Sequence, residues 1–360
     1  MKITFVTPNI NLTGGLRVVS IYAELLCARG HSITIVSPRK DAFNFRQKIK
    51  FLFRRTKTGH KPTFDDSFFK NAPYDVKILN ANRVVSDADV PDADIVIATF
   101  WITAEWISSF SSKKGIKVYF LQHYEIHPWL PVERVKATLF LPFKKVTVAQ
   151  WITDILRDDY NCDDSIVVPN GVDLNQFSSP VRNKQALPTI GMMYSSRIYK
   201  GSDIAIDAFI KAKAVIPQLQ LIAFGTEQPE IALPEGSLYF ERPNQAQLKD
   251  IYNRCDAWLF TSRTEGFGLP ILEAMACRTP VIGSNCGAAP QLIDARNGIL
   301  VDVDNIDQTA EAILKYAEMR NDDWLVASEA AYQTALKNKW EYSCDQFEQA
   351  LLNFIKSDKA

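Results

Sequence analysis

Short β-rich apolar runs alternate with stretches of helical periodicity along the chain, and this alternation limits the fold more than any other feature. Lys2–Thr7 has the composition of a strand. Apolar residues then recur at helical spacing until Gly30, and Ile33–Ser37 returns as a second strand. Strands that alternate with helices assemble into parallel sheets, so the sequence predicts an α/β protein.

The alternation is interrupted once, by the polar segment 178–188, and then restarts. A chain of 360 residues also exceeds the roughly 250–300 residues over which a single core keeps growing. We therefore expect two doubly wound domains, 1–178 and 188–340, with residues 341–360 crossing back to the first. Ligands of such folds bind at the carboxyl ends of the strands, so we expect a cleft between the two domains.

The individual elements follow from the same periodicities. Further strands are expected at Ile95–Thr99, Lys117–Leu121, Val146–Ala149, Ile166–Val168, Ile190–Tyr194, Leu219–Phe224, Leu238–Glu241, Trp258–Phe260 and Val281–Gly283. Three helices are expected near 305–320, 323–338 and 343–356.

Composition excludes several classes of protein. A hydrophobic content of 47% is too high for a disordered chain. The 41 basic residues are balanced by 41 acidic ones, so no nucleic-acid partner is expected. Six scattered cysteines without a CxxC pair indicate reduced, mostly buried thiols. The sequence has neither a signal-peptide pattern nor a membrane-spanning apolar stretch, so we expect a cytoplasmic protein.

Two glycine-containing segments follow predicted strands. Gly14 and Gly15 stand between the first strand and its helix, where glycine lets backbone amides approach an anionic ligand, although an ordinary tight turn explains them equally well. Glu265 follows the strand at Trp258–Phe260, and Gly266 and Gly268 then open a helix that contains Glu273. Carboxylates accept hydrogen bonds from sugar hydroxyls, and amides at a helix start suit a phosphate. The plain alternative is that Glu265 caps the helix and Glu273 faces solvent.

Several motifs in order along the chain resemble the retaining nucleotide-sugar glycosyltransferases of family 4, which have the GT-B architecture. The resemblance is specific from about Val167 to Val301 and looser elsewhere. It rests on Asn170–Asp173 with Phe177, Ser196–Gly201, Glu265 with Glu273, Pro280–Ile282, Asn297–Val301 and Trp340.

The resemblance implies roles for particular residues. Arg197 and Lys200 would hold the donor diphosphate and, with His123 and Glu265, form the catalytic set. Glu273 would bind the ribose hydroxyls, and Glu265 would lie near the donor sugar. Backbone amides in the segment Gly266, Phe267, Gly268 and Leu269 would line the sugar and phosphates, and Gly14 and Gly15 would face the diphosphate.

His123 follows the strand at Lys117–Leu121, where the family often places a histidine beside the sugar, although a structural histidine is the plain alternative. A metal pair of His123 and His127 lacks further ligands. The resemblance implies no metal requirement and no cofactor beyond the nucleotide diphosphate sugar as co-substrate. The short spacing from Arg197 to Lys200, and Arg278 and Gln291 where other residues are usual, leave the donor sugar open.

The segment 39–61 carries nine basic residues and one acidic residue, interleaved with phenylalanines. Such a composition fits contact with an anionic membrane surface. A mobile loop over the acceptor cleft and an RNA-binding segment are the alternatives.

The expected activity is transfer of a hexosyl or deoxyhexosyl group, with retention, to a hydroxyl of a glycan or lipid-linked acceptor. Bacterial surface polysaccharide or glycolipid assembly, at the inner face of the plasma membrane, is the expected setting. A nucleotide-sugar epimerase of GT-B fold and a non-catalytic donor-binding scaffold are the rival hypotheses.

Overall fold

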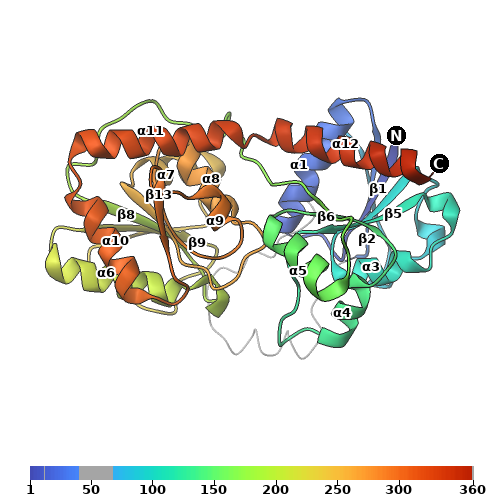
Figure 1. The fold of residues 1–360 in the computed structure, drawn as a ribbon, viewed down its shortest axis with the longest axis horizontal. Helices are drawn as coiled ribbons and strands as arrows, with labels where there is room; N and C mark the ends of the chain where they lie inside the picture. The colour runs from blue at the N-terminus through green and yellow to red at the C-terminus, as the bar shows by residue number, and fades with distance from the viewer. Residues whose placement is uncertain (12, 40–67, 359–360) are drawn as a thin grey trace. The chain divides into compact units, whose positions relative to one another are not determined.

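The computed structural model describes residues 1–11, 13–39 and 68–358 and divides into two compact units. Unit 1 comprises Met1–Val168 and Cys344–Ala360, and unit 2 comprises Pro169–Ser343. Each unit holds one parallel sheet with helices around it (Figure 1). The predicted class, α/β with two doubly wound sheets, is confirmed.

The sheet of unit 1 has the strand order β3-β2-β1-β4-β5-β6-β7. The chain builds outward from β1 in one direction and then from β4 in the other, which is the doubly wound pattern. Every residue of β4 is buried, as expected for a parallel strand covered on both faces. The strands are β1 (Lys2–Val6), β2 (Ser32–Ser37), β3 (Asp75–Ile78), β4 (Ile95–Ala98), β5 (Ile116–Leu121), β6 (Lys144–Thr147) and β7 (Ile166–Val167), and the α-helices are α1 (Gly14–Ala28), α3 (Trp101–Ser108), α4 (Val132–Leu139) and α5 (Gln150–Tyr160).

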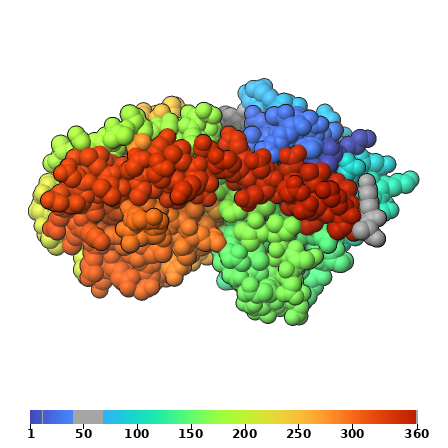
Figure 2. Space-filling view, turned by 45° about the horizontal axis from the view of Figure 1, so that its top comes forward, coloured from blue at the N-terminus to red at the C-terminus, as the bar shows by residue number. Residues whose placement is uncertain are grey.

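The last helix, α12 (Trp340–Asp358), begins in unit 2 and belongs to unit 1 from Cys344 onward. Its Phe347 ring stacks on Tyr22 of α1 at 4.5 Å between centroids and meets Phe120 of β5 edge-on at 5.1 Å. The end of α12, in red, lies along the blue α1 segment in Figure 2. The C-terminal helix therefore completes the core of unit 1, as the predicted architecture requires.

The sheet of unit 2 has the order β10-β9-β8-β11-β12-β13, which is again doubly wound. The strands are β8 (Thr189–Tyr194), β9 (Gln220–Gly225), β10 (Leu238–Glu241), β11 (Ala257–Phe260), β12 (Val281–Ser284) and β13 (Gly298–Val301). The helices are α6 (Ser202–Val215), α7 (Gln245–Asn253), α8 (Leu269–Ala276), α9 (Ala289–Leu292), α10 (Ile306–Glu318) and α11 (Asn321–Lys337).

The polar segment 178–188 lies within unit 2 and not between the units. Arg182 Nη2 donates to the carbonyl of Cys255 at 2.5 Å, and the guanidinium lies 4.5 Å from the centre of the Trp324 ring. The Gln185 amide donates to Asp256 Oδ1 at 2.8 Å. The Arg182 side chain and the Gln185 backbone N–H are thus bonded to buried groups, which is why a segment of linker composition packs as part of a domain.

Three further expectations concern the chain as a whole. All six cysteines are free thiols, and four of them are buried, as predicted. None of the described helices is long and apolar enough to span a bilayer. The basic segment 39–61 lies outside the described residues apart from Arg39.

Candidate functional site

The strand order of unit 2 reverses between the adjacent strands β8 and β11. In doubly wound sheets the segments that follow two such strands turn away from each other and leave room for a ligand at the carboxyl edge. Arg197 and Lys200 follow β8, and Glu265 and the glycines of 266–268 follow β11. The fold thus places most of the predicted donor-site residues at one edge of one sheet.

Lys200 and Glu265 meet at this edge as an ion pair between Lys200 Nζ and Glu265 Oε1. The Ser262 hydroxyl donates to the same carboxylate oxygen at 3.0 Å. The two charged side chains are only 21% and 14% exposed, so both charges are largely withdrawn from water. Removal of either partner would leave the other charge poorly solvated, so the position of each group depends on the other.

Arg263 and Gly201 bring the two loops together. The Arg263 amide donates to the Tyr199 carbonyl at 2.8 Å, and its guanidinium binds Asp203 at 2.7 Å. Gly201 has a φ of 63°, and a Cβ there would lie 1.9 Å from the Thr261 carbonyl oxygen. Only glycine permits this close approach, which carries Lys200 to the end of β11.

Arg197 and Lys200 both lie near the aromatic ring of Tyr199. Arg197 is exposed, and its Nη1 donates to the Tyr199 hydroxyl at 3.0 Å. Arg197 Cζ and Lys200 Nζ lie 5.9 Å and 5.7 Å from the centre of the Tyr199 ring. Arg197 forms no ion pair with a carboxylate of the described residues, so its charge remains available to an anion.

The glycine segment after Glu265 ends at Gly268, the residue before α8, with a φ of 101°. Phe267 is buried, and its carbonyl accepts from the Ala288 amide at 2.9 Å. Leu269 is the first residue of α8 and is half-buried. The start of α8 therefore lies directly beside Glu265, with its backbone fixed by the loop after β12.

Glu273 is buried, at 7% exposure, so the alternative that it faces solvent is wrong. Its Oε2 accepts a hydrogen bond from the Tyr252 hydroxyl at 2.8 Å. Tyr252 lies on α7 and packs against Trp258 of β11, with ring centroids 4.4 Å apart. Tyr252 was not a predicted site residue, because it lies on α7 and strand β11 separates that helix from the motif.

Glu227, two residues after β9, is a carboxylate that sequence reasoning missed. Its Oε1 accepts from the Ser196 amide at 2.9 Å and from the Ser196 hydroxyl at 2.6 Å. These hydrogen bonds and the nearby Arg197 lower the pKa of Glu227. Glu227 therefore fixes the start of the loop that carries Arg197.

The predicted residues of unit 1 also come together. Gly14 and Gly15 are the first residues of α1, and a Cβ on Gly15 would lie 3.4 Å from Gln122 Oε1. His123 follows Gln122 after β5, and its Nδ1 donates to the Tyr124 carbonyl at 2.8 Å. This bond leaves Nε2 as the acceptor nitrogen of the neutral ring.

The rings of His123 and His127 pack against each other, with centroids 4.9 Å apart, in a segment that is not helical. The four-residue separation of the two histidines is therefore not the spacing of a helix. Within the described part of the chain, no three His, Cys, Asp or Glu side chains form a group that could hold a metal ion.

Glu125 is a buried carboxyl beside His123 that sequence reasoning did not single out. Its Oε2 accepts from the Trp101 amide at the start of α3 at 2.8 Å and from the Tyr119 hydroxyl at 3.4 Å. Burial raises the pKa of Glu125 to about 8, although these hydrogen bonds favour its ionised form. Glu125 ties the His123 loop to α3.

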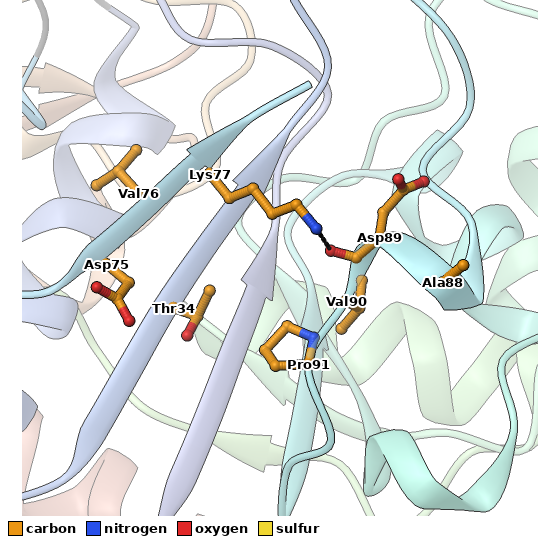
Figure 3. Close-up of a pocket in the computed structure, with 8 residues that line it drawn as sticks. All are labelled: Thr34, Asp75, Val76, Lys77, Ala88, Asp89, Val90 and Pro91. Atoms are coloured by element: carbon orange, nitrogen blue, oxygen red, sulfur yellow. Dashed lines mark hydrogen bonds between the residues drawn. The ribbon is translucent and has the colours of Figure 1, made fainter. Parts of the chain in front are cut away.

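A pocket of about 530 Å³ opens elsewhere in unit 1, on β2 and β3 (Figure 3). Lys77 reaches across it and donates to the Asp89 carbonyl at 2.5 Å. The Asp89 carboxylate accepts two hydrogen bonds from Arg83: Nη1 donates to Oδ2 and Nη2 donates to Oδ1, each at 2.6 Å. The strand residues that line the pocket are Thr34, in the middle of β2, and Asp75, Val76 and Lys77 of β3. The pocket is therefore separate from the predicted site residues, which follow the ends of strands.

Residues 185–319 match the family described as Glycosyl transferases group 1. Unit 2 therefore carries a group 1 glycosyltransferase domain. The matched segment runs from just before β8 to just after α10 and includes Arg197, Lys200, Glu265 and Glu273.

Curated relatives that match this part of the chain include several glycosyltransferases. A D-inositol 3-phosphate glycosyltransferase of Segniliparus rotundus is 32% identical over 159 residues, 38% of this chain and 35% of that protein. The O-antigen chain mannosyltransferase B of Escherichia coli is 34% identical over 96 residues, 26% of this chain and 24% of that protein. The chain spans less than half the length of the first curated relatives that it matches.

Solved structures match over nearly the whole chain. A sucrose-phosphate synthase of Thermosynechococcus elongatus superposes with a TM-score of 0.74 at 16% identity, over 99% of this chain and 100% of that chain. Anabaena HepE in complex with UDP and glucose gives a TM-score of 0.73 at 17% identity, over 98% and 100%. These matches show that the group 1 domain is part of a GT-B fold.

Proposed function

We propose that the chain transfers a hexosyl or deoxyhexosyl group from a nucleotide diphosphate sugar to an acceptor hydroxyl, with retention. The Lys200–Glu265 ion pair at the strand-order switch of a group 1 domain carries the proposal. It joins a cation for the donor diphosphate to a carboxylate for the donor sugar, and Arg197 stands at the same edge. Relatives include a GDP-mannose-dependent mannosyltransferase, and HepE binds UDP-glucose, which supports a nucleotide-sugar donor.

In the proposed reaction the bond between the anomeric carbon and the diphosphate oxygen breaks while the bond to the acceptor oxygen forms on the same face. The proton of the acceptor hydroxyl passes to the departing phosphate oxygen. Lys200 and Arg197 stabilise the negative charge that develops on the diphosphate, and the amides of 266–268 orient it. No bound metal is needed in this scheme, because the two cations supply the positive charge.

Other roles complete the site. Glu273, held by Tyr252, binds the ribose hydroxyls, and Glu265 orients the sugar. His123 Nε2 accepts from a sugar hydroxyl, and Gly14 and Gly15 face the diphosphate.

The acceptor belongs to bacterial surface polysaccharide or glycolipid assembly, and the protein works on the cytoplasmic side, held at an anionic membrane surface by residues 39–61.

A release assay with UDP-, GDP- and dTDP-sugars tests the proposal, after a thermal-shift panel has selected the donor. Transfer releases the nucleotide diphosphate, whereas an epimerase changes the sugar without release and a scaffold does neither. Arg197→Ala and Lys200→Ala should each lower turnover by about 10²–10³-fold. Lys211→Ala is the matched control, because Lys211 pairs with Asp307 on exposed helix faces of the same unit. Near-normal turnover in both variants would contradict the assigned roles.

A further inference from the structure

Ser262 lies between Glu265 and the loop that follows β12. Its side-chain hydroxyl donates to Glu265 Oε1 at 3.0 Å. Its backbone carbonyl accepts from the Ser284 hydroxyl at 2.5 Å and from the Cys286 thiol at 3.0 Å. Ser262 and Ser284 are only 3% and 2% exposed. The Ser262 hydroxyl is therefore fixed by buried neighbours, two residues beyond the end of β11.

The two protein groups that bind the Glu265 carboxylate share one of its oxygens. Lys200 Nζ and the Ser262 hydroxyl both meet Oε1. Among the residues that the structure describes, none donates a hydrogen bond to Oε2. Each oxygen of an ionised carboxylate has two lone pairs. The capacity of Oε1 is therefore used within the protein, whereas Oε2 keeps its capacity for a ligand.

The two contacts at Oε1 respond differently when a donor binds. In the proposed function Lys200 stabilises the diphosphate, which draws its ammonium group away from Glu265. The Ser262 hydroxyl is uncharged and buried, and its backbone is held by Ser284 and Cys286, so the diphosphate does not compete for it. A hydrogen bond to a charged group is also stronger than one between neutral groups. Ser262 is therefore the contact that stays on Glu265 in the donor complex.

We propose that Ser262 is a positioning residue for recognition of the donor sugar. It holds Glu265 through Oε1, so that Oε2 accepts hydrogen bonds from the sugar hydroxyls. The inference rests on the proposed function, which places the donor sugar beside Glu265. Because Ser262 acts only through this carboxylate, its loss should weaken recognition of the sugar and leave recognition of the nucleotide diphosphate unchanged.

Isothermal titration calorimetry on the full chain tests the inference with three ligand pairs: UDP and UDP-glucose, GDP and GDP-mannose, and dTDP and dTDP-rhamnose. The affinity for the nucleotide sugar, divided by the affinity for its nucleotide diphosphate, isolates the contribution of the sugar. In the pair that wild type binds, Ser262→Ala should lower this ratio by about 5- to 10-fold. The affinity for the nucleotide diphosphate itself should not change. Ser262→Thr keeps a hydroxyl and should retain most of the ratio.

Two controls separate positioning from a general loss of structure. Ser328→Ala removes another buried hydroxyl of unit 2, which donates to the Arg278 carbonyl at 2.8 Å, and it should leave the ratio unchanged. Glu265→Ala should lower the ratio, and adding Ser262→Ala to it should lower the ratio no further, because the effect of Ser262 passes through Glu265. Circular dichroism of each variant checks that the fold is intact.

The possible results distinguish the inference from the proposed function. An unchanged ratio in Ser262→Ala, an equal fall in Ser262→Thr or Ser328→Ala, or a further fall in the double variant would overturn the positioning role. Failure of wild type to bind any of the nucleotide sugars, or an unchanged ratio in Glu265→Ala, would contradict the proposed function instead.

Discussion

Lys200 and Glu265 form an ion pair at the point where the strand order of unit 2 reverses. In the proposed donor complex the diphosphate and Glu265 compete for the same ammonium group. The pair therefore holds Lys200 in place before the donor binds. It also weakens donor binding, because the diphosphate must displace the Glu265 carboxylate from Lys200.

This competition predicts opposite effects on binding and on catalysis. Glu265→Gln should bind the free nucleotide diphosphate about 3- to 10-fold more tightly, because Lys200 is released and a neighbouring negative charge is removed. The same variant should transfer sugar far more slowly, since the group beside the donor sugar is altered. Isothermal titration calorimetry and the release assay measure the two quantities. Weaker nucleotide binding in Glu265→Gln would show that the two groups do not compete.

Gly201→Ala should destabilise unit 2 and displace Lys200. A Cβ at Gly201 would collide with a backbone carbonyl, which cannot move like a side chain. Gly236→Ala is the matched control, because Gly236 has a φ of 81° and nothing lies within 4 Å of the added carbon. The free energy of unfolding of the control should fall by about 1–2 kcal/mol, because alanine is strained in the left-handed conformation. For Gly201→Ala it should fall at least about twice as much, because the collision is added to this strain. Equal denaturation midpoints for the two variants would contradict the close approach.

Glu227→Ala should raise the donor KM more than it lowers kcat. The substitution removes both hydrogen bonds to Ser196, so the loop that carries Arg197 becomes less ordered, while no group that touches the donor is lost. We expect an increase of about 5- to 10-fold, corresponding to about 1–1.4 kcal/mol. Glu235→Ala, which alters an exposed carboxyl in the same unit, should change neither constant. A pure kcat effect would place Glu227 in the reaction itself.

Glu125 should make the stability of unit 1 depend on pH. The folded carboxyl titrates near pH 8 and the unfolded one near 4.5, so the folded state holds a proton that the unfolded state has lost between these values. Stability therefore falls as pH rises from about 5 to 8 and levels off above that range. Glu125→Gln removes this dependence, so the difference in apparent Tm between the variant and wild type should move steadily in favour of the variant across the same range, by about 2–4 °C for each kcal/mol that wild type loses. A constant Tm difference from pH 5 to 9 would contradict a buried, protonated Glu125.

Most of the core strands could be predicted from the sequence because they are rich in apolar residues. The edge strand β3 could not, because Asp75 and Lys77 alternate with its apolar residues and none of the four residues is buried. The backbone of β3 is held by pairing with β2, which leaves little hydrophobic signal. The segment at 178–188 was misassigned for a related reason, since its polar residues satisfy buried carbonyl and carboxylate groups.

The donor-site candidates could be predicted to share one edge of a sheet, because each follows a strand. Their individual contacts could not be predicted. Lys200 meets Glu265 across 65 residues of sequence, through a turn that depends on the close approach of Gly201. Glu273 is buried, and the Tyr252 hydroxyl that donates a hydrogen bond to it comes from a different helix. Spacing along the chain contains no information about such partners.

The division of the chain has a consequence for the order of events during protein synthesis. Unit 2 is one continuous segment, whereas unit 1 combines the first 168 residues with the last ones. Tyr22 and Phe120 leave the ribosome long before Phe347, the ring that packs against both. The aromatic surface of the nascent first unit therefore stays uncovered while the second unit is synthesised, and α12 covers it only after all of unit 2 has been made.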